Sequence, residues 1–504
     1  MPPTRMSSVL VLASAFAGAP LFGQDRPSPT VIANAVDSLA QRVMAAGLTP
    51  GLGVAIVMDG RTIFARNYGF ADLTGQVRTT DRTLWYVAST SKSFTGFGIA
   101  LLASQGVIDL NASIASLFPK ARWHADVDPT RLTLANFLSH THHLSGGAVV
   151  MNAAFTGAIA EARWPELLQF SNPTGSPDLV YSNLGYNVAA MVIDTKRPEG
   201  WRRYLENAVY KPAGLHETYA RVSGLDRRRI GVPHYYRADG SFVTLPFFKT
   251  DATMNSAGGH VATIQDLARW VTVQMDSGVL EGRRVFPASA VALSHTQIAP
   301  HTVASSKRFA YFDRAGWGAG WDIGSYEGER MVSRFGSYSS TRSHLSLLPG
   351  RRIGVVAQVN GTPGWNATDL IAAFAYDLEA GRSTAWATAE RRLQQLVDRL
   401  APGRREIASG DSTRAARQRP MDRPLRDFTG TYLSNQLGSF TLELRGETLH
   451  YRWGVLYGPA EVFDAAKRQL RIEVVGSGNV VSFEFGETGP ATAMQVSGAT
   501  FTRQ

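Results

Sequence analysis

The sequence predicts an α/β domain, in which an antiparallel sheet is flanked by helices and interrupted by a helical lobe, followed by a small all-β domain. Three observations support this prediction. The chain opens with a helix and a hairpin, continues through a long stretch of helical patterns, and near residue 340 changes to a hydrophobic period of two. From about residue 428 onwards, short alternating segments are separated by turns.

The opening elements are defined by periodicity and one turn. Apolar residues recur with a helical period from residue 28 to Gly47, where the helix is expected to end. Residues 53–58 and 61–68 read as strands, and Asp59-Gly60 between them is a strong hairpin signal. A sheet is therefore expected to start early in the chain.

The middle of the chain is predicted to be mainly helical, before a second hairpin of residues 344–348 and 353–359 around Pro349-Gly350. The helices expected around it are residues 89–105, 132–139, 186–195, 264–275 and 369–379. The first of these is apolar on most sides, so it is expected to be buried.

Three segments follow from these patterns. We assign residues 28–382 to the α/β domain, 383–426 to a polar helix that ends near Leu400 and a basic linker, and 427–504 to the β domain. The arginine-rich linker is the best candidate for contact with a polyanion. A solvated spacer is the favoured interpretation of it, because charge runs are usually solvated.

Composition excludes several functions. The chain of 504 residues is 44% hydrophobic and 18% charged, which is typical of a globular protein. It has no cysteine, so disulfides, thiolate metal sites and a cysteine nucleophile are excluded. The net charge of +10 is spread along the chain, and we expect no nucleic-acid partner.

The amino terminus resembles a secretory signal. A basic start, an apolar run from Met6 to Ala17 and small residues up to Gly23 predict a signal peptide over residues 1–23. No later segment has the ~18 consecutive apolar residues of a membrane helix. The protein is therefore expected to be exported to the periplasm or the medium.

Ser89 and Lys92 form the first candidate catalytic group. Residues three apart share one face of a helix, so these side chains can meet at a helix start. Burial lowers the pKa of a lysine, and a neutral amine can accept a serine proton. The alternative for so short a motif is an ordinary amphipathic helix.

Two further groups could complete a site. Tyr181 could carry a proton and Asn183 could contact Lys92 and a substrate carbonyl, although a buried tyrosine and a helix cap are the alternatives. Gly336 would let a strand approach a ligand, and the backbone N–H of Ser337 could bind an oxyanion. Arg334 could hold an anionic group, or it could be a solvent-facing strand arginine.

Several segments then occur in an order and spacing that resemble the class C β-lactamase superfamily, with its penicillin-binding D-amino-acid peptidases and esterases. The segments are residues 51–60, Ser89-Thr-Ser-Lys92, residues 132–141, Tyr181-Ser-Asn183 and residues 354–360. The similarity covers about residues 30–380, and the module after residue 428 resembles a β domain often appended to such enzymes.

The resemblance implies a serine β-lactamase/transpeptidase-like fold and a role for each candidate. Ser89 would be the acylated nucleophile and Lys92 its base. Tyr181 would pass the proton to the leaving group, and Asn183 would orient Lys92 and the substrate. The backbone N–H groups of Ser89 and Ser337 would form the oxyanion hole, beside Gly336.

The resemblance also has a departure and a rival. Arg334 stands where the family has lysine or histidine, and Ser340 and Thr341 replace an expected glycine and aromatic residue. These changes argue most against antibiotic hydrolysis. The rival is zinc binding by the run from His140 to His143, but that segment lacks the acidic partner of metal-dependent lactamases.

We therefore expect an exported serine hydrolase without a cofactor or metal, which acts through an acyl-serine on a β-lactam, an ester or a D-amino-acid amide, either as a small molecule or in a cell-wall peptide. The alternative hypothesis is a non-catalytic or slow-turnover receptor of the same fold that binds penicillin or cell-wall material.

Overall fold

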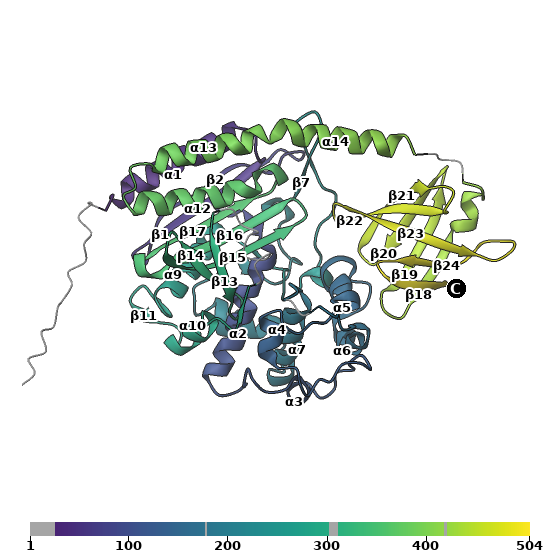
Figure 1. The fold of residues 1–504 in the computed structure, drawn as a ribbon, viewed down its shortest axis with the longest axis horizontal. Coiled ribbons are helices and arrows are strands. Elements are labelled where there is room, and N and C mark those ends of the chain that lie inside the picture. The colour runs from purple at the N-terminus through teal and green to yellow at the C-terminus, as the bar shows by residue number, and fades with distance from the viewer. Residues whose placement is uncertain (1–25, 177–178, 302–310, 418–420) are drawn as a thin grey trace, which may run out of the picture.

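The computed structural model describes residues 26–176, 179–301, 311–417 and 421–504 (Figure 1). The predicted signal peptide lies outside these ranges. An α/β domain and a separate β-barrel lie side by side, and two long helices cross above them. Among the described residues, no helix has the length and apolar character needed to cross a bilayer.

The α/β domain is built on a nine-stranded antiparallel sheet. Its strands, in spatial order, are β12 (Ala299–Pro300), β13 (Asp313–Trp317), β14 (Asp322–Tyr326), β15 (Glu329–Tyr338), β16 (Thr341–Leu348), β17 (Ile353–Val359), β1 (Gly51–Met58), β2 (Arg61–Asp72) and β3 (Val77–Arg78). Both predicted hairpins are confirmed, since β1 pairs with β2 and β16 with β17. The first and last strands of the sheet along the chain, β1 and β17, pair with each other in its middle.

Helices cover both faces of this sheet. On one face, α1 (Pro29–Ala45) and α12 (Trp365–Glu379) pack on β1 and β17, and on the other α9 (Ile264–Met275) packs on the same strands. Strand β1 is buried along its whole length, and its side chains alternate between the two cores, with Ile56 in one and Val57 in the other. Burial on both faces explains why this strand reads as a continuous apolar run.

The helical lobe is inserted between β3 and β12. Its helices are α2 (Ser91–Ser104), α3 (Ile114–Leu117), α4 (Leu134–Leu138), α5 (Gly147–Met151), α6 (Trp164–Leu167), α7 (Leu184–Lys196), α8 (Trp201–Leu205) and α10 (Ala288–Ser294). Short strands join them: β4 (Leu84–Tyr86), β5 (Thr218–Tyr219), β6 (Ile230–Gly231), β7 (His234–Tyr236), β8 (Phe242–Thr244), β9 (Val261–Ala262), β10 (Val279–Leu280) and β11 (Arg283–Arg284). As predicted, α2 is buried over most of its length, so it is the central helix of the lobe.

The segment predicted as a basic linker is largely helical instead. After α13 (Ala385–Asp398), helix α14 (Leu400–Ala415) continues past the point where the sequence predicted the helix to end. Pro402 falls in the first turn, where a helix tolerates proline. None of the residues of α14 is buried, so it lacks the apolar face from which a helix is usually predicted.

The carboxy-terminal domain is a closed eight-stranded barrel, as the predicted small β domain anticipated. Its strands are β18 (Gly430–Ser434), β19 (Gly438–Arg445), β20 (Thr448–Trp453), β21 (Leu456–Asp464), β22 (Gln469–Val474), β23 (Ser477–Phe485), β24 (Ala491–Val496) and β25 (Ala499–Arg503). Buried aromatic side chains, among them Phe440, Trp453 and Phe501, pack against one another in its core. The domain is therefore held by packing of its own, as small barrels commonly are.

The barrel contacts the α/β domain on both the helical lobe and the sheet side. On the helical lobe, the N–H of Val455 donates to the carbonyl of Thr156 at 2.7 Å, and the Asn152 amide donates to the carbonyl of Gln436 at 2.9 Å. On the sheet side, the turn at Gly476 meets the β15–β16 hairpin, because a Cβ added there would lie 2.9 Å from Ser339 Oγ. The barrel thus touches both the lobe and the hairpin that carries Ser337.

Candidate active site

Ser89 lies on a tight turn between β4 and α2. Residues 88–90 form one 3₁₀ turn, and Ala88 before the serine has a left-handed φ of 46°. A left-handed φ at a residue other than glycine costs roughly 1 to 3 kcal/mol, a strain that proteins usually tolerate at functional sites. The turn leaves Ser89 partly exposed above the buried helix α2.

Strand β15 passes directly beside this turn. A Cβ on Gly336 would lie 2.2 Å from the carbonyl oxygen of Val87 and 2.8 Å from the nitrogen of Ser89. No side chain fits in that space, so glycine is required for the close approach predicted from the sequence. The approach places the exposed residue Ser337 in the wall of the crevice that contains Ser89.

Lys92 reaches Ser89 from one turn along the helix. Its ammonium donates to Ser89 Oγ at 3.2 Å, to Asn183 Oδ1 at 2.6 Å and to the carbonyl of Ala257 at 2.7 Å. The lysine is fully buried, and this loss of hydration, helped by the nearby Arg334 charge, lowers its pKa to about 8. Such an amine can take up and release a proton near neutral pH.

Tyr181 approaches the same serine from the loop before α7. Its hydroxyl donates to Ser89 Oγ at 2.7 Å, while its ring remains 40% exposed in the crevice. Burial of the hydroxyl alone would raise the pKa of the phenol. The Lys92 ammonium and the Arg334 guanidinium oppose that effect and lower the pKa of Tyr181 to about 8.

Asn183 stands at the amino-terminal cap position of α7 but does not cap the helix with its side chain. Its Oδ1 accepts a hydrogen bond from Lys92 instead. The structure therefore brings Ser89, Lys92, Tyr181 and Asn183 together in one hydrogen-bonded group, and the alternative that Asn183 is only a helix cap is wrong.

Arg334 is buried, so its alternative as a solvent-facing arginine is also wrong. Only 1% of it is exposed, and its Nη2 donates to the Tyr181 hydroxyl at 2.9 Å while its Nε donates to the carbonyl of Ser89 at 3.0 Å. The third nitrogen, Nη1, lies 3.4 Å from Asp322 Oδ2. The guanidinium is thus held by Tyr181, Ser89 and Asp322, and its shortest contact is with the Tyr181 phenol.

Asp322 anchors this arrangement and was missed by the sequence analysis. It also accepts hydrogen bonds from Arg314 and contacts His301 Nε2 at 3.0 Å. Burial alone would raise the pKa of this carboxyl, but these neighbours, together with Arg334, lower it to about 2. No local pattern marks Asp322, because its partners are brought to it by the neighbouring strands of the sheet.

An aromatic wall encloses the phenol. Trp317 stacks on Tyr181 with ring centroids 5.6 Å apart, and His140 lies 4.6 Å from each of these two rings. Burial and the positive charges nearby lower the pKa of His140 well below its usual value, so the ring is neutral. It accepts a hydrogen bond at Nδ1 from the backbone of Ser182.

In the part of the chain that the structure describes, no three histidine, cysteine or acidic side chains are grouped as metal ligands. The zinc hypothesis therefore has no ligand set there. His142 stacks on Phe137 and accepts at Nδ1 from the N–H of Leu144. His140 and His142 therefore bind different partners rather than one centre.

These side chains line a small crevice of about 160 Å³. Arg314, Arg334 and Arg342 are among the described lining residues; the first two pair with Asp322, and Arg342 pairs with Asp369. With the Lys92 ammonium, positive charge exceeds negative charge beside the partly exposed Ser89, whose Oγ two proton-carrying groups contact. This combination has the geometry that a nucleophilic serine requires.

Comparison with known proteins identifies the family. Residues 36–377 match the Beta-lactamase family, so the chain belongs to the Beta-lactamase family. Protein flp of Staphylococcus aureus (strain NCTC 8325 / PS 47) is 21% identical over 330 residues, 64% of this chain and 62% of its own length. Penicillin-binding protein 4 of Amycolatopsis lactamdurans is 25% identical over 62% of this chain and 81% of its own length.

Solved structures share the fold. The octameric penicillin-binding protein homologue from Pyrococcus abyssi aligns with a TM-score of 0.59 at 16% identity, covering 93% of this chain and 99% of that one. A class C beta-lactamase mutant aligns with a TM-score of 0.55 at 18% identity, covering 70% of this chain and 99% of that one. The D-amino acid amidase from Ochrobactrum anthropi SV3 aligns with a TM-score of 0.52 at 20% identity, covering 65% of this chain and 91% of that one. The resemblance inferred from the motifs is confirmed at the level of family and fold.

Proposed function

We propose that this protein is a serine hydrolase that transfers an acyl group from an amide or ester to Ser89 and then to water. One observation supports this most directly: Ser89 Oγ accepts hydrogen bonds from both Lys92 and Tyr181. Two groups whose pKa values are both lowered to about 8 can take the seryl proton and return it. A receptor has no need of this proton relay.

The acylation step follows from these contacts. When the Lys92–Tyr181 pair has lost one proton, it can accept the proton of Ser89 as Oγ forms a bond to the substrate carbonyl carbon. The carbonyl oxygen becomes an oxyanion, for which the N–H groups of Ser89 and Ser337 are the candidate donors. The C–N or C–O bond then breaks as Tyr181 returns the proton to the leaving group.

Deacylation repeats the sequence with water. The pair removes a proton from the attacking water, the ester bond to Ser89 breaks, and the proton returns to Oγ. Arg334 supports both steps, because its positive charge beside the phenol stabilises the ionised form of Tyr181. No metal or cofactor is needed in this sequence.

The crevice favours a small acyl group. Its volume of about 160 Å³ lies below the roughly 300 to 1,000 Å³ of ordinary small-molecule pockets. We therefore place amides and esters of a single D-amino acid ahead of bulky β-lactams, which also agrees with the replacement of the family's lysine or histidine by Arg334. The amidase named above gives the fold-level precedent for such a substrate.

The test is a substrate panel on the purified protein. D-alanyl p-nitroanilide, a short p-nitrophenyl ester and nitrocefin are compared at equal concentrations, with the Ser89→Ala variant alongside. We expect the anilide or the ester to be hydrolysed and the variant to lose at least a thousandfold in kcat/KM. Equal turnover by Ser89→Ala would refute the proposal, and acylation without turnover would favour the receptor.

Export is part of the proposal and is supported by the signal-like residues 1–23. Expression of the full-length chain in a Gram-negative host, followed by fractionation and amino-terminal sequencing, tests it. We expect a periplasmic protein that begins near residue 24. An uncleaved protein confined to the cytoplasm would contradict it.

A further inference from the structure

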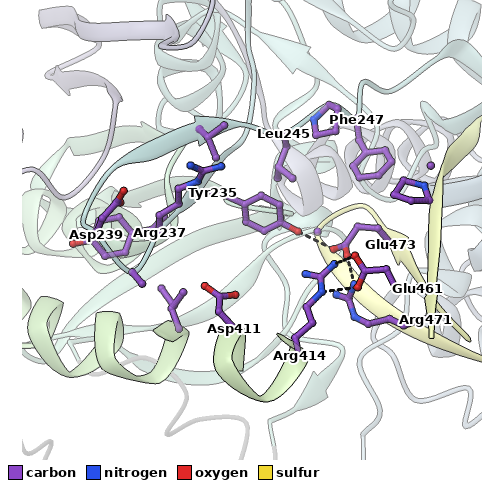
Figure 2. A pocket seen from close by; sticks show the side chains of 18 of the residues that line it. Tyr235, Arg237, Asp239, Leu245, Phe247, Asp411, Arg414, Glu461, Arg471 and Glu473 are labelled. Atoms are coloured by element: carbon purple, nitrogen blue, oxygen red, sulfur yellow. Dashed lines mark hydrogen bonds and ion pairs between the residues drawn. The ribbon is translucent and has the colours of Figure 1, made fainter. Parts of the chain in front are cut away.

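A second and larger cavity lies between the two domains, away from Ser89. It measures about 1,000 Å³ and is bounded by the β7–β8 hairpin and the loop after it, by helix α14, and by strands β21 and β22 of the barrel (Figure 2). This volume is at the upper end of the range that small-molecule sites use. It has room for a ligand of more than one ring.

Hydrogen bonds and ion pairs tie the walls of this cavity together. Arg414 of α14 donates to both carboxylate oxygens of Glu461 on β21, at 2.7 and 2.6 Å. The Tyr235 hydroxyl of β7 donates to Glu473 on β22 at 2.8 Å, and Arg471 pairs with the same carboxylate at 2.7 Å (Figure 2). The polar groups are therefore held in place before any ligand arrives, which lowers the entropy lost on binding.

The charges of the cavity nearly balance, with one carboxylate in excess. Among the described lining residues, three are arginines and four are carboxylates: Arg237, Arg414, Arg471, Asp239, Asp411, Glu461 and Glu473. An anionic ligand would have to compete with Glu461 and Glu473 for their arginines. The cavity thus does not select anions, although the protein as a whole carries a charge of +10.

Aromatic and apolar surfaces lie between these polar groups. Tyr457 on β21 is 60% exposed, the highest exposure among the large hydrophobic side chains found exposed in the described chain. Phe247 and Leu245 line the cavity from the loop after β8 (Figure 2), where Phe247 is partly exposed and Leu245 is buried. A large exposed ring at the edge of a cavity commonly marks a contact surface for a ligand.

Fixed donors and acceptors next to aromatic faces match one class of ligand. Each sugar hydroxyl both donates and accepts, so it can bridge an arginine and a neighbouring carboxylate without disturbing their charge balance. The C–H faces of sugar rings are apolar and can cover an exposed tyrosine ring. We propose that the interdomain cavity binds a neutral oligosaccharide.

Calorimetric titration of the full chain tests this proposal. The probes are chitotetraose and cellotetraose, and the measurement is repeated in the Ser89→Ala variant, so that the result does not depend on the proposed hydrolase activity. We expect binding of at least one neutral probe with a Kd in the micromolar to low millimolar range, and the same affinity in Ser89→Ala.

Two variants place the ligand. Tyr457→Ala removes the exposed ring and should weaken binding at least tenfold, whereas Leu444→Ala, a change of an exposed hydrophobic residue on barrel strand β19, should leave it unchanged. Asp411→Trp fills the cavity from α14, which has no buried residue to disturb, and should abolish binding. Thermal melting checks that each variant is folded.

Three results would overturn the proposal. One is no heat of binding for either neutral probe at 10 mM. Another is equal affinity in wild type, Tyr457→Ala and Asp411→Trp. The third is that a heparin oligosaccharide or a charged peptide binds in a Tyr457-dependent manner while the neutral sugars do not.

Discussion

The two cavities of this protein use charged side chains in opposite ways. In the crevice of about 160 Å³, Lys92, Tyr181 and Arg334 converge on one another and on Ser89, and positive charge is in excess. In the cavity of about 1,000 Å³, arginines and carboxylates neutralise each other. The first arrangement shifts pKa values and prepares proton transfer. The second offers a fixed surface for binding.

Burial explains this difference. Lys92 is fully buried, so the ammonium loses hydration and its pKa falls. Arg414 and Glu461 remain 40% and 25% exposed, and water screens their interaction. The crevice should therefore respond strongly to single substitutions and to pH, and the cavity only weakly.

The largest effect is expected from Lys92→Met. It removes the amine beside Ser89, and a loss of about a thousandfold in kcat/KM is expected, within the range of general-base contributions. Lys249→Met is the matched control. Lys249 is also buried and has a pKa lowered to about 7, but its ammonium donates to the carbonyls of Ala154 and Thr253 and lies 4.1 Å from the centroid of the Tyr338 ring, rather than donating to Ser89. It should retain activity within tenfold, and equal losses in both variants would contradict the assignment.

The pH dependence is the next test. Because Lys92 and Tyr181 both have a pKa lowered to about 8, kcat/KM should rise with pH through about 8 as the pair loses a proton. Arg334 lowers both values, so Arg334→Gln should move this acid limb upward by roughly one unit and reduce the rate at pH 7 about tenfold. A limb that stays in place would mean that Arg334 has only a structural role.

A smaller effect should connect the two regions. Gly476 lines the large cavity and faces Ser339, which lies in the turn after Ser337. Gly476→Asn adds bulk against that turn. It should lower kcat by about three- to tenfold, because it displaces Ser337 on β15, whose N–H is a candidate oxyanion donor. In Gly498→Asn, also in a barrel turn with positive φ but with open space around it among the described residues, kcat should match wild type. Identical kinetics of the two variants would remove the connection.

The smallest effect is expected from the rim of the large cavity. Arg414→Ala breaks a partly exposed ion pair and should lower the free energy of unfolding by less than about 1 kcal/mol. Urea denaturation measures this change, with Arg445→Ala, which breaks the more exposed pair with Glu443, as the comparison. A loss above about 2 kcal/mol would show that this one pair holds α14 to the barrel.

Local spacing made part of this site predictable. Ser89 and Lys92 share a helix face, and the hairpin around Asp59-Gly60 is fixed by its turn. Tyr181 and Asn183 lie about ninety residues away. Their residue types made them candidates, but only the family resemblance implied that they reach Ser89, since no periodicity shows it.

Long-range pairing and solvent exposure account for what the sequence did not reveal. Asp322 and Trp317 meet Arg334, and Arg314 meets Asp322, only because β13, β14 and β15 are neighbours in the sheet. The sequence predicted a linker where α14 lies, because this segment has no apolar face that would be buried. The interdomain cavity likewise depends on how separately folded parts dock, and sequence patterns carry no record of that.

Rapid quenching followed by peptide mass mapping tests the central claim most directly. Wild-type protein is mixed with a D-alanyl ester, quenched in acid within milliseconds to seconds, digested and analysed for an added acyl mass. The account predicts that the adduct forms on Ser89, appears before free product accumulates and is absent from Ser89→Ala. Steady hydrolysis with no adduct at any time, or an adduct on Ser91 or Ser93 instead, would contradict it.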